Sequence, residues 1–169
     1  MSAPKRRLQH SFNNFFLAMQ SQIDPDGTAK FFMDIKERFA SLQHGFAEFR
    51  DRLQAVGEKN PYFDWKVSPL AESRQSFELK YLTIKVRAVL SVRPSVDLSG
   101  VISFYRLDEF DATAASKIDS FTFEGERGIT NVKLSSGADL SVVVEKHVSV
   151  LMLAVLRKAC ESEVDDSSN

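Results

Sequence analysis

The longest regular pattern in the chain is a stripe of apolar residues between positions 28 and 56. Its members recur in alternating steps of three and four residues: Phe32, Ile35, Phe39, Leu42, Phe46, Phe49, Leu53 and Val56. This spacing places them on one side of an α-helix, which at 1.5 Å per residue would be about 40 Å long. We expect Thr28 or Asp26 to cap its start, and Gly57 to end it in a left-handed conformation.

A shorter apolar pattern predicts an earlier helix over residues 8–22, which the turn-forming segment 24–27 stops. Because the connection is short, the two helices are expected to form an antiparallel hairpin. The positions that flank the long stripe contain no acidic residue, so a parallel coiled coil of two copies would lack charge neutralisation. We therefore expect the protein's own sheet to cover the stripe. These flanking residues are Lys36, Arg38, Gln43, Gly45, Arg50 and Arg52.

After Pro61 the apolar period changes from 3.6 to 2, which is typical of strands. Residues 62–67 predict a first strand that ends at Pro69. Between residues 77 and 92 the apolar positions are first odd-numbered and then, from Leu82 onward, even-numbered. A strand changes its buried side only through an extra residue, so this pattern predicts one long strand with a β-bulge or a sharp bend near Tyr81 and Leu82.

Further strands are expected over residues 101–107, 117–124 and 129–134, followed by a closing helix over residues 143–163. The run Val142–Val144 fits either the end of a sixth strand or the start of this helix. The predicted fold is a single α+β domain over residues 1–169. It has an N-terminal helical hairpin with one long helix, a curved antiparallel sheet of about five strands, and a C-terminal helix.

Composition limits the possible environments and partners. The net charge of −1 gives no overall attraction to nucleic acid or to a membrane, while residues 1–10 are basic and residues 161–169 acidic, as expected for flexible tails. Cys160 is the only cysteine, which fits a reducing compartment without disulfides. The longest apolar run, residues 148–156, is too short to span a bilayer. We expect a cytoplasmic protein that does not act at a membrane.

The most enzyme-like set of residues is Asp64, Glu78 and Lys80. Two carboxylates and a lysine on neighbouring strands can hold a divalent metal ion and activate water. An acid followed, after a gap, by Glu-x-Lys resembles the PD-(D/E)xK nucleases, and the resemblance implies a metal-dependent nuclease. Pro61, however, is not adjacent to Asp64 as the first motif of that family requires. The alternative is that Glu78 and Lys80 occupy the solvated face of an alternating strand.

A second candidate is the basic strand 80–93, in which Lys80, Lys85, Arg87 and Arg93 occur without an acidic residue between them. Such a face suits nucleic acid, or it keeps a sheet soluble and its edge unpaired. No histidine has a ligand-spaced histidine or cysteine companion, so no metal or cofactor is predicted.

The leading hypothesis is a non-enzymatic protein-binding or assembly module, chaperone-like or adaptor-like. In general architecture alone, with no match of residues, the predicted fold resembles type III secretion chaperones. The partner is expected to be another protein or a second copy of the chain. Fourteen phenylalanines in 169 residues favour a homodimer. The alternatives are a metal-dependent nuclease and a nucleic-acid binder.

Overall fold

A computed structural model describes residues 24–70, 73–93, 98–108, 114–124 and 127–166. The helix predicted over residues 8–22, and with it the helical hairpin, lies outside the described residues. Residues 1–37 and residues 38–169 form two compact units, and the first described helix contributes to both. The elements in order are α2 (Pro25–Lys59), β1 (Lys66–Pro69), β2 (Ser76–Tyr81), β3 (Ile84–Arg93), β4 (Ser99–Leu107), β5 (Ala115–Glu124), β6 (Ile129–Lys133), β7 (Asp139–Ser141) and α3 (Glu145–Asp166).

The start of α2 is capped by Asp24 rather than by the predicted Asp26 or Thr28. The carboxylate oxygen Oδ1 of Asp24 accepts a hydrogen bond from the backbone N–H of Asp26 at 3.1 Å. The carbonyl oxygen of Asp24 accepts another from the N–H of Thr28 at 2.9 Å. Pro25 then occupies the first helical position, where its missing N–H costs nothing.

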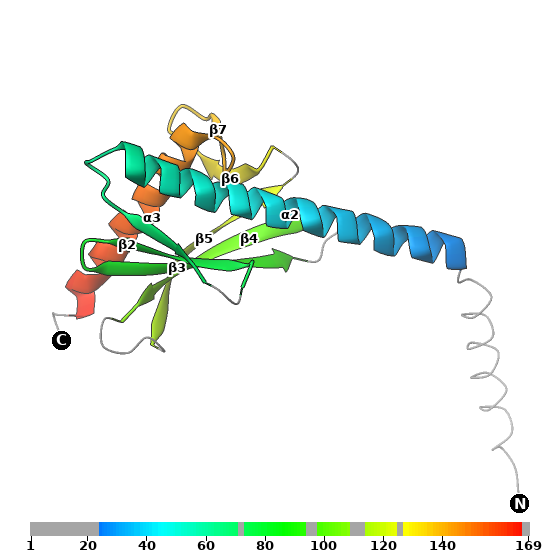
Figure 1. The fold of residues 1–169 in the computed structure, drawn as a ribbon, viewed down its shortest axis with the longest axis horizontal. Helices are drawn as coiled ribbons and strands as arrows, with labels where there is room; N and C mark the ends of the chain where they lie inside the picture. The colour runs from blue at the N-terminus through cyan, green and yellow to red at the C-terminus, as the bar shows by residue number, and fades with distance from the viewer. Residues whose placement is uncertain (1–23, 71–72, 94–97, 109–113, 125–126, 167–169) are drawn as a thin grey trace, which may run out of the picture. The chain divides into compact units, whose positions relative to one another are not determined.

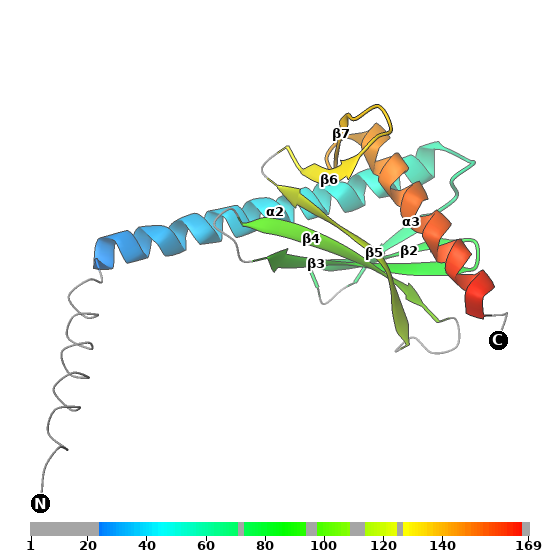
Figure 2. The ribbon, with the colours of Figure 1, turned by 180° about the vertical axis from the view of Figure 1, so that it is seen from behind.

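The sheet has seven strands, so the expectation of about five was too low. Their order is β1-β2-β3-β4-β5-β6-β7, and every neighbouring pair is antiparallel. The chain therefore forms an uninterrupted meander, visible from both sides in Figures 1 and 2. The short strand β7 precedes Val142–Val144, which forms a turn, so α3 begins at Glu145. At its other end α3 continues to Asp166, so residues 161–166 of the predicted acidic tail are helical.

The prediction of one long strand with a bulge or sharp bend near Tyr81 and Leu82 is wrong as to the single strand, because the chain reverses at that point and β2 and β3 form a hairpin. Tyr81 pairs with Ile84, so only Leu82 and Thr83 lie in the turn. Directly paired residues in an antiparallel sheet project to the same face. Odd-numbered residues of β2 therefore share a face with even-numbered residues of β3, which accounts for the change of phase in the sequence. Irregularities in register lie instead between Phe104 and Tyr105 in the β4–β5 pair and between Ile129 and Lys133 in the β6–β7 pair.

The first strand is shorter than predicted, because residues 61–63 form a turn and β1 begins at Lys66. Phe63 stacks on Trp65 with ring centroids 4.8 Å apart and planes at 8°. Trp65 is buried and donates its indole N–H to the carbonyl oxygen of Leu53 in α2 at 2.7 Å. These contacts fix the connection between α2 and the sheet. Pro69 is compatible with β1, because β1 is an edge strand.

Within residues 38–169, α2 packs on the inner face of the sheet. The ring of Phe49 lies 6.0 Å from Phe77 of β2, 6.4 Å from Phe104 of β4 and 6.0 Å from Phe121 of β5, between centroids. Phe46 is 2% exposed, which confirms its prediction as a core residue. Phe39, expected to be buried as well, is only half-buried.

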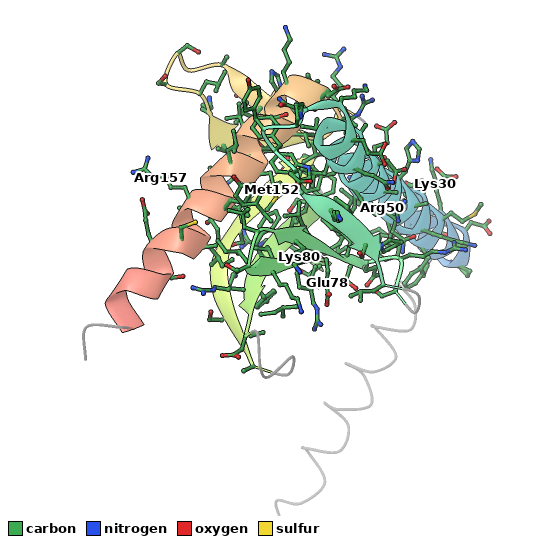
Figure 3. All side chains as sticks on the ribbon, turned by 60° about the vertical axis from the view of Figure 1, so that its left-hand side comes forward. Lys30, Arg50, Glu78, Lys80, Met152 and Arg157 are labelled. Atoms are coloured by element: carbon green, nitrogen blue, oxygen red, sulfur yellow. The ribbon has the colours of Figure 1, made fainter. Side chains whose placement is uncertain are left out.

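The second helix, α3, packs on the same face and lies against β5 and β7 (Figure 2). Lys158 of α3 donates to Asp119 at 2.6 Å, and Asp119 pairs directly with the core residue Phe104. Met152 is fully buried, whereas Arg157 points away from the sheet (Figure 3). The other face of β2, β3 and β4 is covered by neither described helix. Within the described residues, no helix is long and apolar enough to cross a membrane.

Candidate functional site

The outer face of the sheet, which points away from α2 and α3, carries most of the residues that the sequence singled out. Glu78 and Lys80 lie on this face of β2, two residues apart, and both are visible in Figure 3. On β3 the odd-numbered residues face the same way, which places Lys85, Arg87 and Arg93 there. The four residues of the predicted basic face therefore share one side of the sheet.

Glu78 is engaged by Arg87, its direct partner across the β2–β3 pair. The guanidinium of Arg87 donates to Oε1 of Glu78 through Nη2 at 2.7 Å and through Nε at 3.1 Å. Both side chains are about one-third exposed, at 29% and 34%. The pair stabilises the sheet by at most about 1 kcal/mol, because it remains open to solvent. It also cancels most of the charge that either residue presents.

Asp64 lies away from Glu78. Glu78 pairs with Ser68 of β1, whereas Asp64 precedes Ser68 by four residues, lies outside β1 and has a φ of 23°. Ligands of one divalent ion lie only about 2.0–2.6 Å from it. In the described part of the chain no three histidine, cysteine or acidic side chains form a group that could hold a metal ion. Strand alternation thus places Lys80 beside Glu78 on β2, whereas the register places Asp64 two residues beyond Lys66, the partner of Lys80, and not opposite Glu78.

Lys80 has a lysine on each side. It pairs directly with Lys66 of β1 and with Lys85 of β3, so three ammonium groups cross three adjacent strands. We call Lys66, Lys80 and Lys85 the lysine row. All three side chains are exposed, and none of their ammonium groups has a hydrogen-bond or ion-pair partner among the described residues. Sequence reasoning missed Lys66, because only the strand register shows which residue faces Lys80.

The other two members of the predicted basic face do not join the lysine row. Arg87 is paired with Glu78, and Arg93 is eight residues from Lys85 along β3, about 27 Å away. The predicted basic face is thus one cluster of lysines, one neutralised arginine and one distant arginine.

A second surface lies on α2 within residues 24–37. Phe31, Phe32 and Met33 are consecutive and are 59%, 64% and 63% exposed. The rings of Phe31 and Phe32 meet edge to face, with centroids 5.8 Å apart and planes at 70°. We call these three residues the apolar turn. Phe32 belongs to the apolar stripe of the sequence, whose members from Leu42 onward are buried in the core.

The described histidines do not form a catalytic group. His147 accepts a hydrogen bond from the backbone N–H of Ser141 through Nδ1 at 3.2 Å, which connects β7 to the start of α3. His44 lies on the exposed side of α2 and its Nε2 is 3.9 Å from Glu48. His10 lies outside the described residues.

No family model matches the chain, and neither a curated protein nor a solved structure matches it. Function is therefore inferred from the two surfaces of the molecule itself.

Proposed function

We propose that the protein is a non-catalytic protein-binding or assembly module, and that the apolar turn of α2 is the surface that binds. The observation that supports this proposal is the exposure of three consecutive large apolar side chains in one turn of helix. Successive residues in a helix are about 100° apart, so the three side chains cover roughly 200° of its circumference. A contiguous apolar patch of this kind marks an interaction site.

The size of the effect is consistent with association. Because Phe31, Phe32 and Met33 are 59%, 64% and 63% exposed, removing their remaining surface from water contributes roughly 3–5 kcal/mol. Association costs about 4–15 kcal/mol in lost freedom, so the partner must also cover neighbouring residues such as Ile35. Ile35 is half-buried and lies on the same stripe as Phe32.

A second copy of the chain is a partner that the sequence of α2 suits. Within residues 25–39, apolar residues lie at equal distances on the two sides of Phe32: Ala29 and Ile35 are three residues away, and Pro25 and Phe39 are seven. Two copies that cross antiparallel at Phe32 would place apolar residues opposite apolar residues. A parallel pair would instead bring Lys36 next to its own copy.

Cross-linking tests this arrangement directly. In a background where Cys160→Ser removes the native thiol, Phe32→Cys places a thiol at the proposed two-fold axis, and Glu37→Cys is the matched control on the same helix. We expect an oxidised Phe32→Cys dimer and no comparable Glu37→Cys dimer. Sedimentation should show that Phe32→Glu is monomeric at concentrations where the unaltered chain is a dimer.

Two results would overturn the proposal at different levels. A chain that is monomeric throughout the micromolar range excludes self-assembly through α2. If the Phe32→Cys thiol of that monomer also reacts with iodoacetamide far more slowly than the Glu37→Cys thiol, the chain itself covers the apolar turn, and the turn is no binding surface.

The metal-dependent nuclease remains an alternative with less support. Its acidic residues are separated by the strand register, and Glu78 is already paired with Arg87. Nucleic-acid binding is the other alternative, and it depends on the lysine row.

A further inference from the structure

We propose that the lysine row and Leu82 form a docking site for an acidic segment of a partner protein that also carries an apolar side chain. This site shares no residue with the apolar turn of α2. Either surface can therefore be disproved without affecting the other.

The first argument is the unfavourable arrangement of the lysine row itself. Side chains that pair directly across antiparallel strands have Cβ atoms only about 4.5–5.5 Å apart, and like charges at that distance destabilise a sheet. Lys80 has a like charge directly opposite on both neighbouring strands, Lys66 on β1 and Lys85 on β3. An anionic partner would remove the repulsion on binding.

Protection of a sheet edge does not account for the lysine row. A lysine on an edge strand hinders pairing with other chains. This explanation applies to Lys66, because β1 is the edge of the sheet. Lys80 and Lys85 lie on β2 and β3, which have neighbours on both sides.

The second argument is the turn next to the lysine row. Leu82 has a φ of 53° and is 70% exposed at the end of the β2–β3 hairpin. Left-handed backbone is unfavourable for a bulky residue, and asparagine or glycine is the usual choice in such turns. A leucine here is both strained and open to water, and it lies two residues from Lys80 and three from Lys85. Contact with an apolar side chain of a partner would remove Leu82 from water and account for a leucine at this position.

The charges around the lysine row leave it positive. The acid nearest to Lys80 on the same strand face, Glu78, is neutralised by Arg87. Asp64, two residues before Lys66, is the next acid in that part of the chain and makes no ion pair with a described residue. Among the described residues of β1, β2 and β3 and their connections, Asp64 is therefore the one further carboxylate near the three ammonium groups, and on β4 Asp108 follows Leu107, the partner of Lys85.

The geometry favours a protein segment over the other polyanions. The lysine row spans three adjacent strands, about 10 Å, and its spacing of roughly 5 Å approximates one turn of an acidic helix with carboxylates at i, i+4 and i+8. Single-stranded nucleic acid binds where bases can stack on aromatic rings. Among the described residues, the outer face of β2, β3 and β4 carries one aromatic, Tyr105, which lies opposite Arg87, and the exposed Tyr62 lies in the turn four residues before Lys66. A lipid surface would be met by one exposed leucine, which is little apolar area for insertion.

The experiment uses a short fluorescein-labelled peptide of glutamate and leucine residues, read by fluorescence anisotropy with the full chain. A variant with Lys66→Gln, Lys80→Gln and Lys85→Gln is compared with a charge-matched control in which Lys36→Gln, Lys133→Gln and Lys146→Gln change lysines elsewhere. We expect the first variant to bind at least about tenfold more weakly, a loss of about 1.4 kcal/mol. The control should bind like the unaltered chain. Leu82→Gly, which suits the left-handed backbone, should weaken binding as well.

Stability supplies an independent measurement. Lys80→Glu replaces two repulsive pairs by two attractive ones, so it should raise the melting temperature and abolish peptide binding. A variant that is more stable but no longer binds the peptide would show that the lysine row serves binding and not the stability of the fold.

Other outcomes contradict the proposal. Equal losses in the two triple variants would show that net charge, and not the lysine row, attracts the peptide. No binding to the peptide, together with lysine-row-dependent binding to a single-stranded oligonucleotide or to vesicles of phosphatidylcholine and phosphatidylserine, would assign the site to nucleic acid or to lipid instead. No binding to any of the three probes would remove the site.

Discussion

Trp65 donates its indole N–H to the carbonyl oxygen of Leu53 at 2.7 Å, across twelve residues of chain and within the core. Leu53 is near the end of α2, and Trp65 immediately precedes β1. The bond therefore joins the helix to the edge of the sheet. Because Trp65 is buried, its donor has no water to replace this partner.

Trp65→Phe should destabilise the protein by about 1–3 kcal/mol, because it removes the donor and leaves part of the indole volume unfilled. Urea unfolding followed by circular dichroism measures this change. The exposed Tyr62→Phe, three residues away, is the control and should leave the unfolding midpoint unchanged. Equal stability of Trp65→Phe and the unaltered chain would mean that the hydrogen bond contributes nothing.

Gly57 has a different role from the one predicted for it. It does not end α2, which continues to Lys59, and it is not among the residues with a positive φ. A Cβ atom at Gly57 would lie 2.5 Å from both Cδ1 and the carbonyl oxygen of Trp65. The absence of a side chain lets Trp65 reach the helix.

Gly57→Ala should therefore cost about 1–3 kcal/mol through overpacking, even though alanine is favoured over glycine in a helix by about 1 kcal/mol. The sign of the change in melting temperature shows whether overpacking or the higher helix propensity of alanine is the larger effect. Glu58→Ala, at the exposed neighbouring position, should be close to neutral. A rise in stability on Gly57→Ala would show that Trp65 can move without cost.

The apolar stripe of α2 should give a graded response to truncation. Phe46→Ala removes a ring that is 2% exposed and packed 5.3 Å from Phe77, so we expect a loss of about 3–5 kcal/mol. Phe39→Ala, at a half-buried position, should cost about 1–2 kcal/mol. Denaturant titration of both variants tests the order, and a larger loss at Phe39 than at Phe46 would contradict the assignment of the core.

Divalent metal ions should not stabilise the protein. Any ion at Glu78 must displace the guanidinium of Arg87, and Asp64 precedes β1 and is not opposite Glu78, whose partner on β1 is Ser68. A site saturated at a hundred times its dissociation constant would raise the free energy of unfolding by about 2.7 kcal/mol. We expect no change in melting temperature with millimolar magnesium or manganese, and no cleavage of DNA or RNA. A rise that Glu78→Gln abolishes would restore the nuclease hypothesis.

The general architecture followed from the sequence because its apolar periods are long and regular. The helix predicted from Thr28 to Val56 lies within three residues of both observed ends. The alternation after Pro61 predicted an antiparallel sheet. What the pattern could not show was the hairpin at Leu82, because leucine and threonine are not the usual residues of a two-residue turn. The change from odd-numbered to even-numbered apolar positions has two possible explanations, an irregularity within one strand or a tight turn between two strands. The residues at the turn favoured the first explanation, and the structure has the second.

The candidate site was predictable only in part, for a related reason. Lys80 and Lys85 stood out as basic residues on one strand phase, yet their meaning depends on which residues lie opposite. Lys66 joined them, and Arg87 was neutralised by Glu78, through a register that no local signal reveals. Likewise, one helical stripe contains both buried Phe46 and exposed Phe32, because periodicity gives the side of a helix but not what covers it.

The uninterrupted meander has a consequence for how the protein is made. Each strand pairs only with the strand just before and just after it in the chain, so all pairing in the sheet can proceed hairpin by hairpin during synthesis. The inner face cannot be fully covered in that period, because α3 follows the last strand. Until α3 has left the ribosome, α2 is the only helix that can cover the inner face of the sheet, on which Phe104 and Phe121 lie. If the sheet pairs during synthesis, it is complete while its inner face is only partly covered. Apolar surface exposed at such a stage is what chaperones bind.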